Sequence, residues 1–177
     1  MTIRHDDFDF RMGLEDYREI HEQFIEKGLT ETAVIQFTHH GFPSWKPKLV
    51  EYLNTAPNWD IQLHCWAHDP YDKMSFPEIV RDLAACFHLF SELFGRKPTI
   101  WFPPWNGKSP EMVETASIFG LTINNESNDI AKFIREYDKG VKDWHSLYFH
   151  GWNNNERVLV PEMLKRVLAL EKECIES

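Results

Sequence analysis

Strand-like and helix-like segments alternate along this chain, and that order limits the folds available to it. Residues 2–4 have the pattern of a short strand, and a helical stripe of apolar residues follows from Leu14 to Phe24 before Gly28 ends it. The next strand is expected at residues 33–37. Strands that alternate with helices through short turns predict a parallel sheet with the helices outside it.

The alternation continues to the end of the chain. Further strands are expected at residues 60–64, 99–102, 121–124 and 147–149, and further helices at 47–54, before Gly95, at 110–120, at 128–137 and from Pro161 onward. A complete eight-fold barrel usually needs about 250 residues. The 177 residues, 42% of them hydrophobic, therefore predict one α/β domain over 1–177, a shortened, distorted (β/α) barrel with six or seven parallel strands.

Polar side chains fall directly after several of the expected strands. They are Asp6, Asp7, His64, His68, His150 and those of the turn Pro103-Pro104-Trp105. Barrels of this kind build their active sites at the carboxyl ends of the strands. We therefore expect these residues to meet in one site.

His64 and His68 are candidate metal ligands. The spacing alone is weak evidence, because a chain with nine histidines produces such a pair by chance, and a structural role is the alternative. The context favours a site, since His64 ends an expected strand and Asp69-Pro70 forms a turn after His68. Two imidazoles and one carboxylate leave a coordination position open for water, as in catalytic zinc centres.

The adjacent carboxylates Asp6 and Asp7 are common enough that a solvated turn or a helix cap is the alternative interpretation. Their position after the first strand favours a functional one. Adjacent side chains in an extended or turning backbone point in different directions, so that one carboxylate can bind a cation while the other accepts a proton.

His150 and two tryptophans complete the candidate site. An isolated histidine in an aromatic strand is more often part of the core, although the glycine that follows His150 permits a close loop. Trp105 and Trp152 can stack on a sugar ring, with a core position as the alternative. The segment His39-His40-Gly41 also follows a strand and is a candidate for substrate contacts.

Charge and cysteine content exclude several classes of partner. The net charge of −9 and a pI of about 5.4 argue against nucleic acid and anionic membranes. Three cysteines without CxxC spacing indicate neither a disulfide framework nor a thiolate zinc site. Without a signal peptide or a long apolar run, the chain is expected to be cytoplasmic and to act on a small molecule or an oligosaccharide.

These motifs, in this order, resemble those of the polysaccharide deacetylase family, the NodB-homology domain of carbohydrate esterase family 4. The resemblance runs from Asp6 to His150, through His64, His68 and the turn at Pro104 and Trp105. It implies Asp6 as general base and His150 as general acid. It further implies Asp7, His64 and His68 as metal ligands, the Trp105 amide as an oxyanion donor, and Pro104 and Trp152 as substrate contacts.

The sequence departs from the family at two places. Phe102 stands where the family has an arginine that pairs with the catalytic base, so that charge is absent or is supplied by Arg4 or Arg11. The family's aspartate that orients the catalytic histidine has no convincing match. Nearby candidates are Asn125, Asp129 and Asp143.

The resemblance implies a deacetylase that uses one divalent metal ion to remove the N-acetyl group from an amino sugar or oligosaccharide. Zinc is the default ion, and two imidazoles with one carboxylate also suit cobalt, nickel, iron or manganese. Two alternatives stay open: a related C–N hydrolase acting on a small cyclic amide, and a non-catalytic carbohydrate-binding protein on the same fold.

Overall fold

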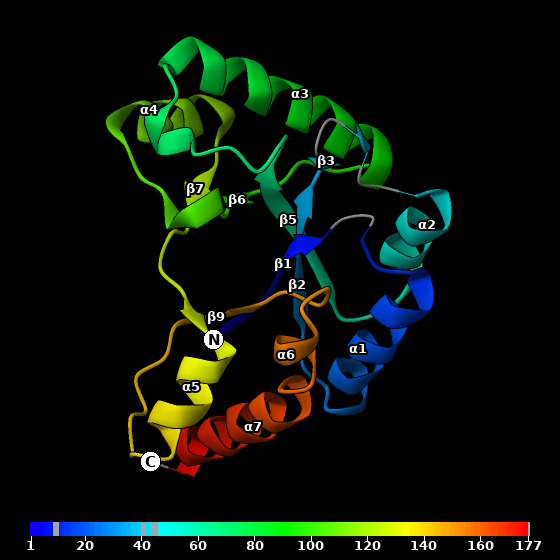
Figure 1. Ribbon diagram of the computed structural model, residues 1–177, viewed down its shortest axis with the longest axis vertical. Coiled ribbons are helices and arrows are strands. Elements are labelled where there is room, and N and C mark those ends of the chain that lie inside the picture. The colour runs from blue at the N-terminus through cyan, green and yellow to red at the C-terminus, as the bar shows by residue number, and fades with distance from the viewer. Residues whose placement is uncertain (9–10, 40–41, 44–45, 177) are drawn as a thin grey trace.

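A single sheet of seven parallel strands forms the centre of the protein, seen in a computed structural model that describes residues 1–8, 11–39, 42–43 and 46–176 (Figure 1). The strands are β1 (Thr2–Phe8), β2 (Glu31–Gln36), β5 (Trp59–Cys65), β6 (Ile100–Trp101), β7 (Thr122–Ile123), β8 (Asn128–Asp129) and β9 (Ser146–Phe149). Their order is β7-β6-β5-β2-β1-β9-β8, and each neighbouring pair is parallel. This curled half-barrel confirms the predicted shortened, distorted barrel.

Helices lie outside the sheet, as the alternating pattern predicts (Figure 1). They are α1 (Leu14–Glu26), α2 (Pro47–Thr55), α3 (Phe76–Phe94), α4 (Pro110–Phe119), α5 (Ile130–Tyr137), α6 (Asn154–Arg157) and α7 (Val160–Glu176), with 3₁₀ turns η1 (Tyr71–Lys73) and η2 (Pro104–Asn106). Local sequence sets the ends of α3: Ser75 and Glu78 form a capping box, and Gly95 ends the helix at φ 63°.

The core lies between the sheet and the helices. All six residues of β2, the strand in the middle of the order, are buried. Tyr17, Ile20 and Phe24 of α1 are buried against the sheet, as the apolar stripe predicts. Burying a large apolar side chain contributes roughly 1.5–3 kcal/mol, so this core fixes the strands whose ends carry the polar residues.

Two elements differ from the predicted ones. The first strand does not stop at Arg4 but runs to Phe8. The expected helix over 128–137 begins only at Ile130, because residues 128 and 129 pair with β9 as β8, and the Asp129 side chain caps α5 by accepting a hydrogen bond from the Lys132 amide at 2.8 Å. Additional short elements are α6 and an antiparallel pair, β3 (Thr38–His39) and β4 (Phe42–Pro43).

In the described part of the chain, no helix combines the length and the apolar character needed to cross a bilayer.

Candidate metal centre and active site

A cavity of about 260 Å³ opens where the carboxyl ends of the central strands meet. It is lined by Asp6, Asp7, His64, His68, Pro103, Trp105, Asn106, Tyr148, His150 and Trp152. Apart from the segment His39-His40-Gly41, every residue predicted for the site lines this cavity except Pro104, which is buried in η2 beside the lining residue Pro103.

A bulge in β1 directs both adjacent carboxylates toward the cavity. His5 pairs with Ala33 and Phe8 with Ile35, so that β1 has one more residue than β2 over this stretch. Asp7 lies in the left-handed region at φ 52°, which aspartate tolerates better than most residues. Bulges of this type bend a strand and redirect its side chains. The two carboxylates therefore line the same cavity instead of alternating between the faces of the sheet.

A second bulge occurs in β5. Ile35 pairs with Leu63 while Gln36 pairs with Cys65, which leaves His64 as the extra residue. His68 follows in the irregular segment after the strand. Both strands that carry the candidate metal ligands are thus irregular at the ligand position, and β2 between them is their common partner.

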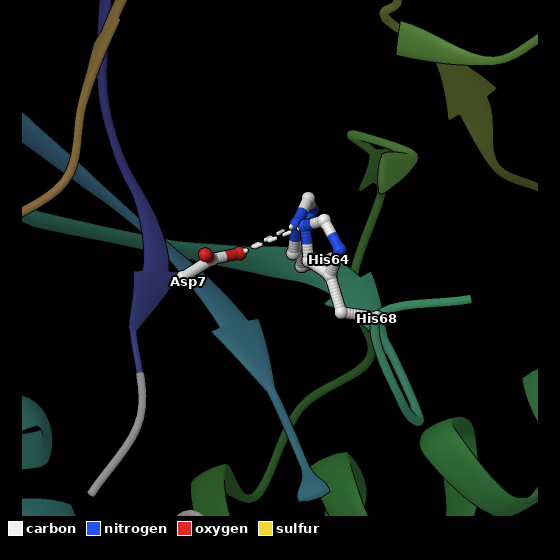
Figure 2. Close-up of side chains that lie close together, drawn as sticks. All are labelled: Asp7, His64 and His68. Carbon is white, nitrogen blue, oxygen red and sulfur yellow. Dashed lines mark ion pairs between the residues drawn. The ribbon is translucent and has the colours of Figure 1, made fainter. Parts of the chain in front are cut away.

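Asp7, His64 and His68 bring three potential ligand atoms together (Figure 2). Asp7 Oδ1 lies 3.1 Å from His64 Nε2 and 3.2 Å from His68 Nε2. His64 Nδ1 is 2.5 Å from the Phe102 carbonyl, so Nδ1 carries a proton and donates it, and Nε2 is the ring atom that faces the Asp7 carboxylate. These two atoms lie this close only if a proton or a metal cation is between them. Among the described residues, neither Asp7 Oδ1 nor His64 Nε2 forms a hydrogen bond, which fits a metal site.

The surroundings of Asp7 keep its carboxyl ionised. Burial alone raises the pKa of Asp7, but the adjacent imidazoles of His64 and His68 outweigh burial and hold the pKa far below its ordinary value. Arg11 lies 3.1 Å from the second carboxylate oxygen, and its guanidinium stands over the Trp152 ring at 4.3 Å. One oxygen of Asp7 is therefore held by Arg11 while the other faces the two histidines.

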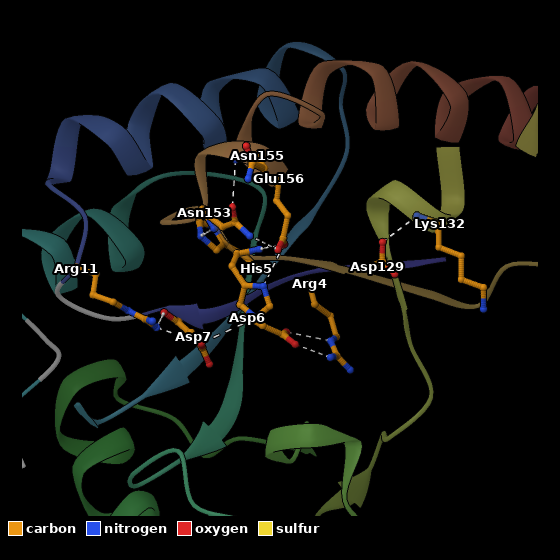
Figure 3. A network of polar contacts seen from close by, with 12 residues as sticks. Arg4, His5, Asp6, Asp7, Arg11, Asp129, Lys132, Asn153, Asn155 and Glu156 are labelled. Atoms are coloured by element: carbon orange, nitrogen blue, oxygen red, sulfur yellow. Dashed lines mark hydrogen bonds and ion pairs between the residues drawn. The ribbon is translucent and has the colours of Figure 1, made fainter. Parts of the chain in front are cut away.

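Asp6 has a different arginine. Arg4 Nε and Nη2 donate to its two carboxylate oxygens at 3.1 and 2.5 Å, and both side chains are almost completely buried (Figure 3). The Arg4 guanidinium lies over the Phe102 ring, 4.6 Å from its centre. Of the two arginines that the sequence leaves open, Arg4 thus contacts Asp6 and Arg11 contacts Asp7. Phe102, which the resemblance places at the position of the family's arginine, provides the aromatic face on which Arg4 rests.

His150 is held by Glu156, which the sequence analysis missed. Glu156 Oε2 lies 2.7 Å from the His150 amide nitrogen and 3.0 Å from its Nδ1, and Asn153 donates to Glu156 Oε1 at 2.6 Å. His150 Nε2 then points toward Asp7, 3.9 Å from Oδ2. Burial lowers the pKa of His150, but the hydrogen bond to Glu156 and the neighbouring carboxylates prevail and raise it.

Two of the three candidates considered from the sequence for this orienting role serve elsewhere. Asp129 caps α5, and Asp143 pairs with His145 at 3.4 Å. A signal for Glu156 does exist in the sequence, because an Asn at a helix start followed three residues later by Glu is the spacing of a capping box. The Asn153 side chain accepts a hydrogen bond from the Asn155 amide and starts α6 (Figure 3).

Two tryptophans flank the cavity. Trp105 is 73% exposed and meets the His68 ring edge-on at 4.8 Å, and Trp152 is 40% exposed. Trp105 and Asn106 both have positive φ, 58° and 51°. For a bulky residue this conformation is unusual, and such strain is concentrated at functional sites. The hydrogen bonds of this turn run from Asn106 N to Pro103 O and from Gly107 N to Pro104 O, and neither uses the Trp105 amide.

For the segment His39-His40-Gly41, the structure describes only the backbone of His39. His39 ends β3, and residues 40 and 41 lie outside the described part of the chain.

A sequence model of the family described as "Polysaccharide deacetylase" matches residues 17–124. This span contains His64 and His68, whereas Asp6 and Asp7 precede it and His150 follows it. No curated protein matches the chain in sequence at a significant level.

Several solved structures share the fold. A family 4 carbohydrate esterase from Streptomyces lividans, in complex with acetate, superposes with a TM-score of 0.75 at 14% identity, covering 96% of this chain and 88% of the esterase. The peptidoglycan deacetylase PdaC from Bacillus subtilis gives 0.74 at 13% identity, with coverage of 94% and 81%. A family 4 pseudoenzyme from Bacillus anthracis gives 0.75 at 12% identity, covering 97% of this chain but only 60% of that protein.

Proposed function

Because the chain belongs to the polysaccharide deacetylase family, we propose that it is a metal-dependent hydrolase that removes the acetyl group from an N-acetylated amino sugar or oligosaccharide. One observation carries the proposal: the acceptor atoms of Asp7 and His64 face each other 3.1 Å apart without a hydrogen bond among the described residues, beside a separate carboxylate and a separate histidine. All of these groups line one cavity, which supports a single catalytic domain over residues 1–177.

Asp7, His64 and His68 would hold one divalent cation. Zinc is the default, and cobalt, nickel, iron and manganese suit the same ligands. When bound, such an ion acts as a Lewis acid toward the amide carbonyl and lowers the pKa of a water molecule. Arg11 would hold the second oxygen of Asp7, so that this carboxylate offers one oxygen to the metal.

Asp6 is proposed to be the general base. It lines the cavity and precedes Asp7 in the sequence, but it does not belong to the cluster of three potential metal ligands. The two hydrogen bonds from Arg4 fix the plane of its carboxylate. A carboxylate held in this way accepts the proton of the attacking water without losing its orientation.

His150 and the Trp105 amide are proposed to act on the other side of the scissile bond. The Trp105 N–H would donate a hydrogen bond to the oxyanion that forms when water attacks the carbonyl. His150, whose pKa is raised on balance although burial by itself lowers it, would donate a proton to the departing amine. Glu156 keeps the His150 ring in place by binding both its Nδ1 and its backbone amide.

The proposed substrate is a carbohydrate that carries an acetamido group. Trp105 and Trp152 both line the cavity and are both exposed in part, and aromatic rings of this kind stack on sugar rings. A compact cavity that is flanked by two exposed rings suits an acetamido group inside and the saccharide above it.

A second candidate is a protein that binds carbohydrate without hydrolysing it. The similarity to the Bacillus anthracis pseudoenzyme favours it, because that protein shares the fold at a TM-score of 0.75. A hydrolase acting on a small cyclic amide is a third alternative, and such a reaction releases no acetate.

The proposal is tested by measuring acetate release from N-acetylglucosamine oligomers, with the protein stripped by a chelator and then given zinc or cobalt. We expect acetate only from the metal-loaded protein, and we expect Asp6→Asn to reduce kcat about 10²–10⁴-fold while the metal content stays unchanged. Full metal occupancy without acetate release from any acetylated sugar would contradict the proposal, and retained saccharide binding would then favour the binding protein.

A further inference from the structure

A chain of buried polar residues lies behind the cavity. His5 Nδ1 is 2.7 Å from Glu31 Oε1, and His21 Nδ1 is 2.8 Å from Glu31 Oε2. At the far end, His21 Nε2 reaches the Pro57 carbonyl at 2.7 Å. His5, Glu31 and His21 are at most 1% exposed, so water does not supply their hydrogen bonds.

The other end of this row of hydrogen-bonded side chains reaches the backbone beside His150. The Gly151 amide donates a hydrogen bond to His5 Nε2 at 3.0 Å. Because Nε2 accepts, the proton of the neutral His5 ring is on Nδ1, from which it is donated to Glu31. Both hydrogen bonds are therefore donated in the same direction, from Gly151 to His5 and from His5 to Glu31. Each of them orients the group that makes the next one.

Packing leaves the His5 ring no room to turn. It meets the Phe149 ring at 4.6 Å, the Phe8 ring at 5.0 Å and the Tyr17 ring at 5.4 Å. A Cβ atom on residue 151 would lie 2.3 Å from His5 Nε2 and 2.9 Å from Met12 Sδ, which is closer than real contacts allow. Only glycine fits at this position while His5 keeps its place.

A carboxylate in the core is costly unless several hydrogen bonds compensate it, and an apolar side chain would fill the same space without this cost. Glu31 serves to hold two imidazoles, and through His5 it reaches the backbone next to His150. Glu156 holds the same dipeptide from the opposite direction, through the His150 amide and ring.

We propose that His5, oriented by Glu31 and His21, is a positioning residue that fixes the Gly151 amide and thereby the placement of His150. This inference rests on the proposed role of His150 as general acid. A displacement of a catalytic group by about 1 Å can cost on the order of a hundredfold in rate, so the link matters even though His5 does not line the cavity.

Two substitutions separate the two hydrogen bonds of His5. Asparagine places an amide near the position of Nδ1, so His5→Asn keeps the donor for Glu31 and loses the acceptor for Gly151. Glutamine reaches the position of Nε2, so His5→Gln keeps the acceptor for Gly151 and loses the donor. We expect His5→Asn to lower kcat about ten- to a hundredfold with unchanged KM and metal content, and His5→Gln to regain most of that loss. His88→Asn, on an exposed side chain of α3, is the control and should match the wild type.

A second readout does not depend on activity. The Gly151 amide should exchange its hydrogen slowly in the wild type, faster in His5→Asn, and slowly again in His5→Gln. Should His5→Asn fail to fold, Gly151→Ala replaces it, and its added Cβ should displace the loop and lower kcat with the metal retained.

The outcomes distinguish the two proposals. An active wild type whose kcat is unchanged in His5→Asn or in Gly151→Ala overturns the role of His5 and leaves the proposed function standing. A wild type that releases no acetate overturns the proposed function, and with it the role of His5 in placing His150 for proton transfer. In that case the hydrogen exchange of the Gly151 amide still decides whether His5 holds this loop.

Discussion

The two sides of the cavity hold their functional groups by different means. On one side, Asp7 and His64 stand on bulges in β1 and β5, so the backbone itself directs them. On the other side, His150 follows the short strand β9, Glu156 of α6 binds its amide and ring, and His5 of β1 accepts a hydrogen bond from the amide of the next residue, Gly151. The side with the proposed metal ligands, called the metal side, is therefore set largely by strand pairing, and the side with the proposed general acid, called the acid side, by individual hydrogen bonds.

This difference has a consequence for substitutions. Bulges that are embedded between paired strands persist when single side chains change, so the metal side should fail only when a ligand is removed. A group held by single hydrogen bonds loses its position by degrees as they are removed one at a time.

The largest effect is expected from the double substitution His64→Ala with His68→Ala. Removing two of the three ligands should lower metal affinity by more than about a hundredfold and abolish hydrolysis, since even partners of ligands cost that much in other sites. Metal content after dialysis measures the change, and His145→Ala, at an exposed histidine, is the control. If the double variant kept one ion per chain, the metal side would not lie at these residues.

The next effect concerns the buried pair of Arg4 and Asp6. Arg4→Met leaves the Asp6 carboxylate buried without its partner and should cost about 3–5 kcal/mol of unfolding free energy. Adding Asp6→Asn should recover part of this loss, because the uncompensated charge is removed. Urea unfolding measures both, and Arg11→Met, at a partly exposed side chain, should cost less. Equal losses for the two arginines would contradict the distinction drawn between Asp6 and Asp7.

On the acid side, Glu156→Gln should reduce kcat about tenfold and shift its pH dependence. A general acid works while protonated, so activity declines as pH rises through the pKa of His150. Burial lowers that pKa, but Glu156 helps to raise it on balance, and its loss should move the alkaline limb to lower pH. A pH profile of kcat tests this, and an unmoved limb would show that His150 does not depend on Glu156.

The smallest effect is expected where α6 is tied to α1. Arg157 pairs with Asp16 at 2.9 Å and also with Glu19, and the hydrogen bond from Arg157 lowers the pKa of Asp16. Because these side chains are partly exposed, Arg157→Gln should cost less than about 1 kcal/mol. A lowered pKa means that this contribution is present above about pH 4 and disappears as pH falls further. The difference in Tm between variant and wild type should therefore shrink from pH 7 to pH 3.

Much of the fold follows from the sequence because its signals are periodic. The apolar stripe of α1 and the glycine that ends α3 predict those helices, and the order of elements predicts the parallel sheet. β8 escaped prediction, because two residues that pair with β9 carry no periodic pattern and look like the start of α5.

The residues of the candidate site could be predicted where a motif falls at the end of a strand. They could not be predicted where the pairing register of the strands determines the direction of a side chain. The bulge at Asp6 and Asp7 depends on how β1 pairs with β2, which no local pattern contains. Arg4 was one of two open candidates, since the choice required the side-chain contact with Asp6. Glu156 was missed because it approaches His150 from six residues downstream, within a short helix that the sequence analysis did not expect.

Arg4 and Asp6 belong to the same strand, two residues apart, and this has a dynamic consequence. Strands β6 and β7, at one edge of the sheet, have only two residues each, and the turn that contains Trp105 follows β6. Such edges open locally at a small fraction of the free energy needed for global unfolding. If this edge opened, the Trp105 amide would move with it, whereas Arg4 and Asp6 would stay together because they lie on one strand in the interior of the sheet. Local opening at the rim of the cavity would therefore leave the hydrogen bonds between Arg4 and Asp6 intact.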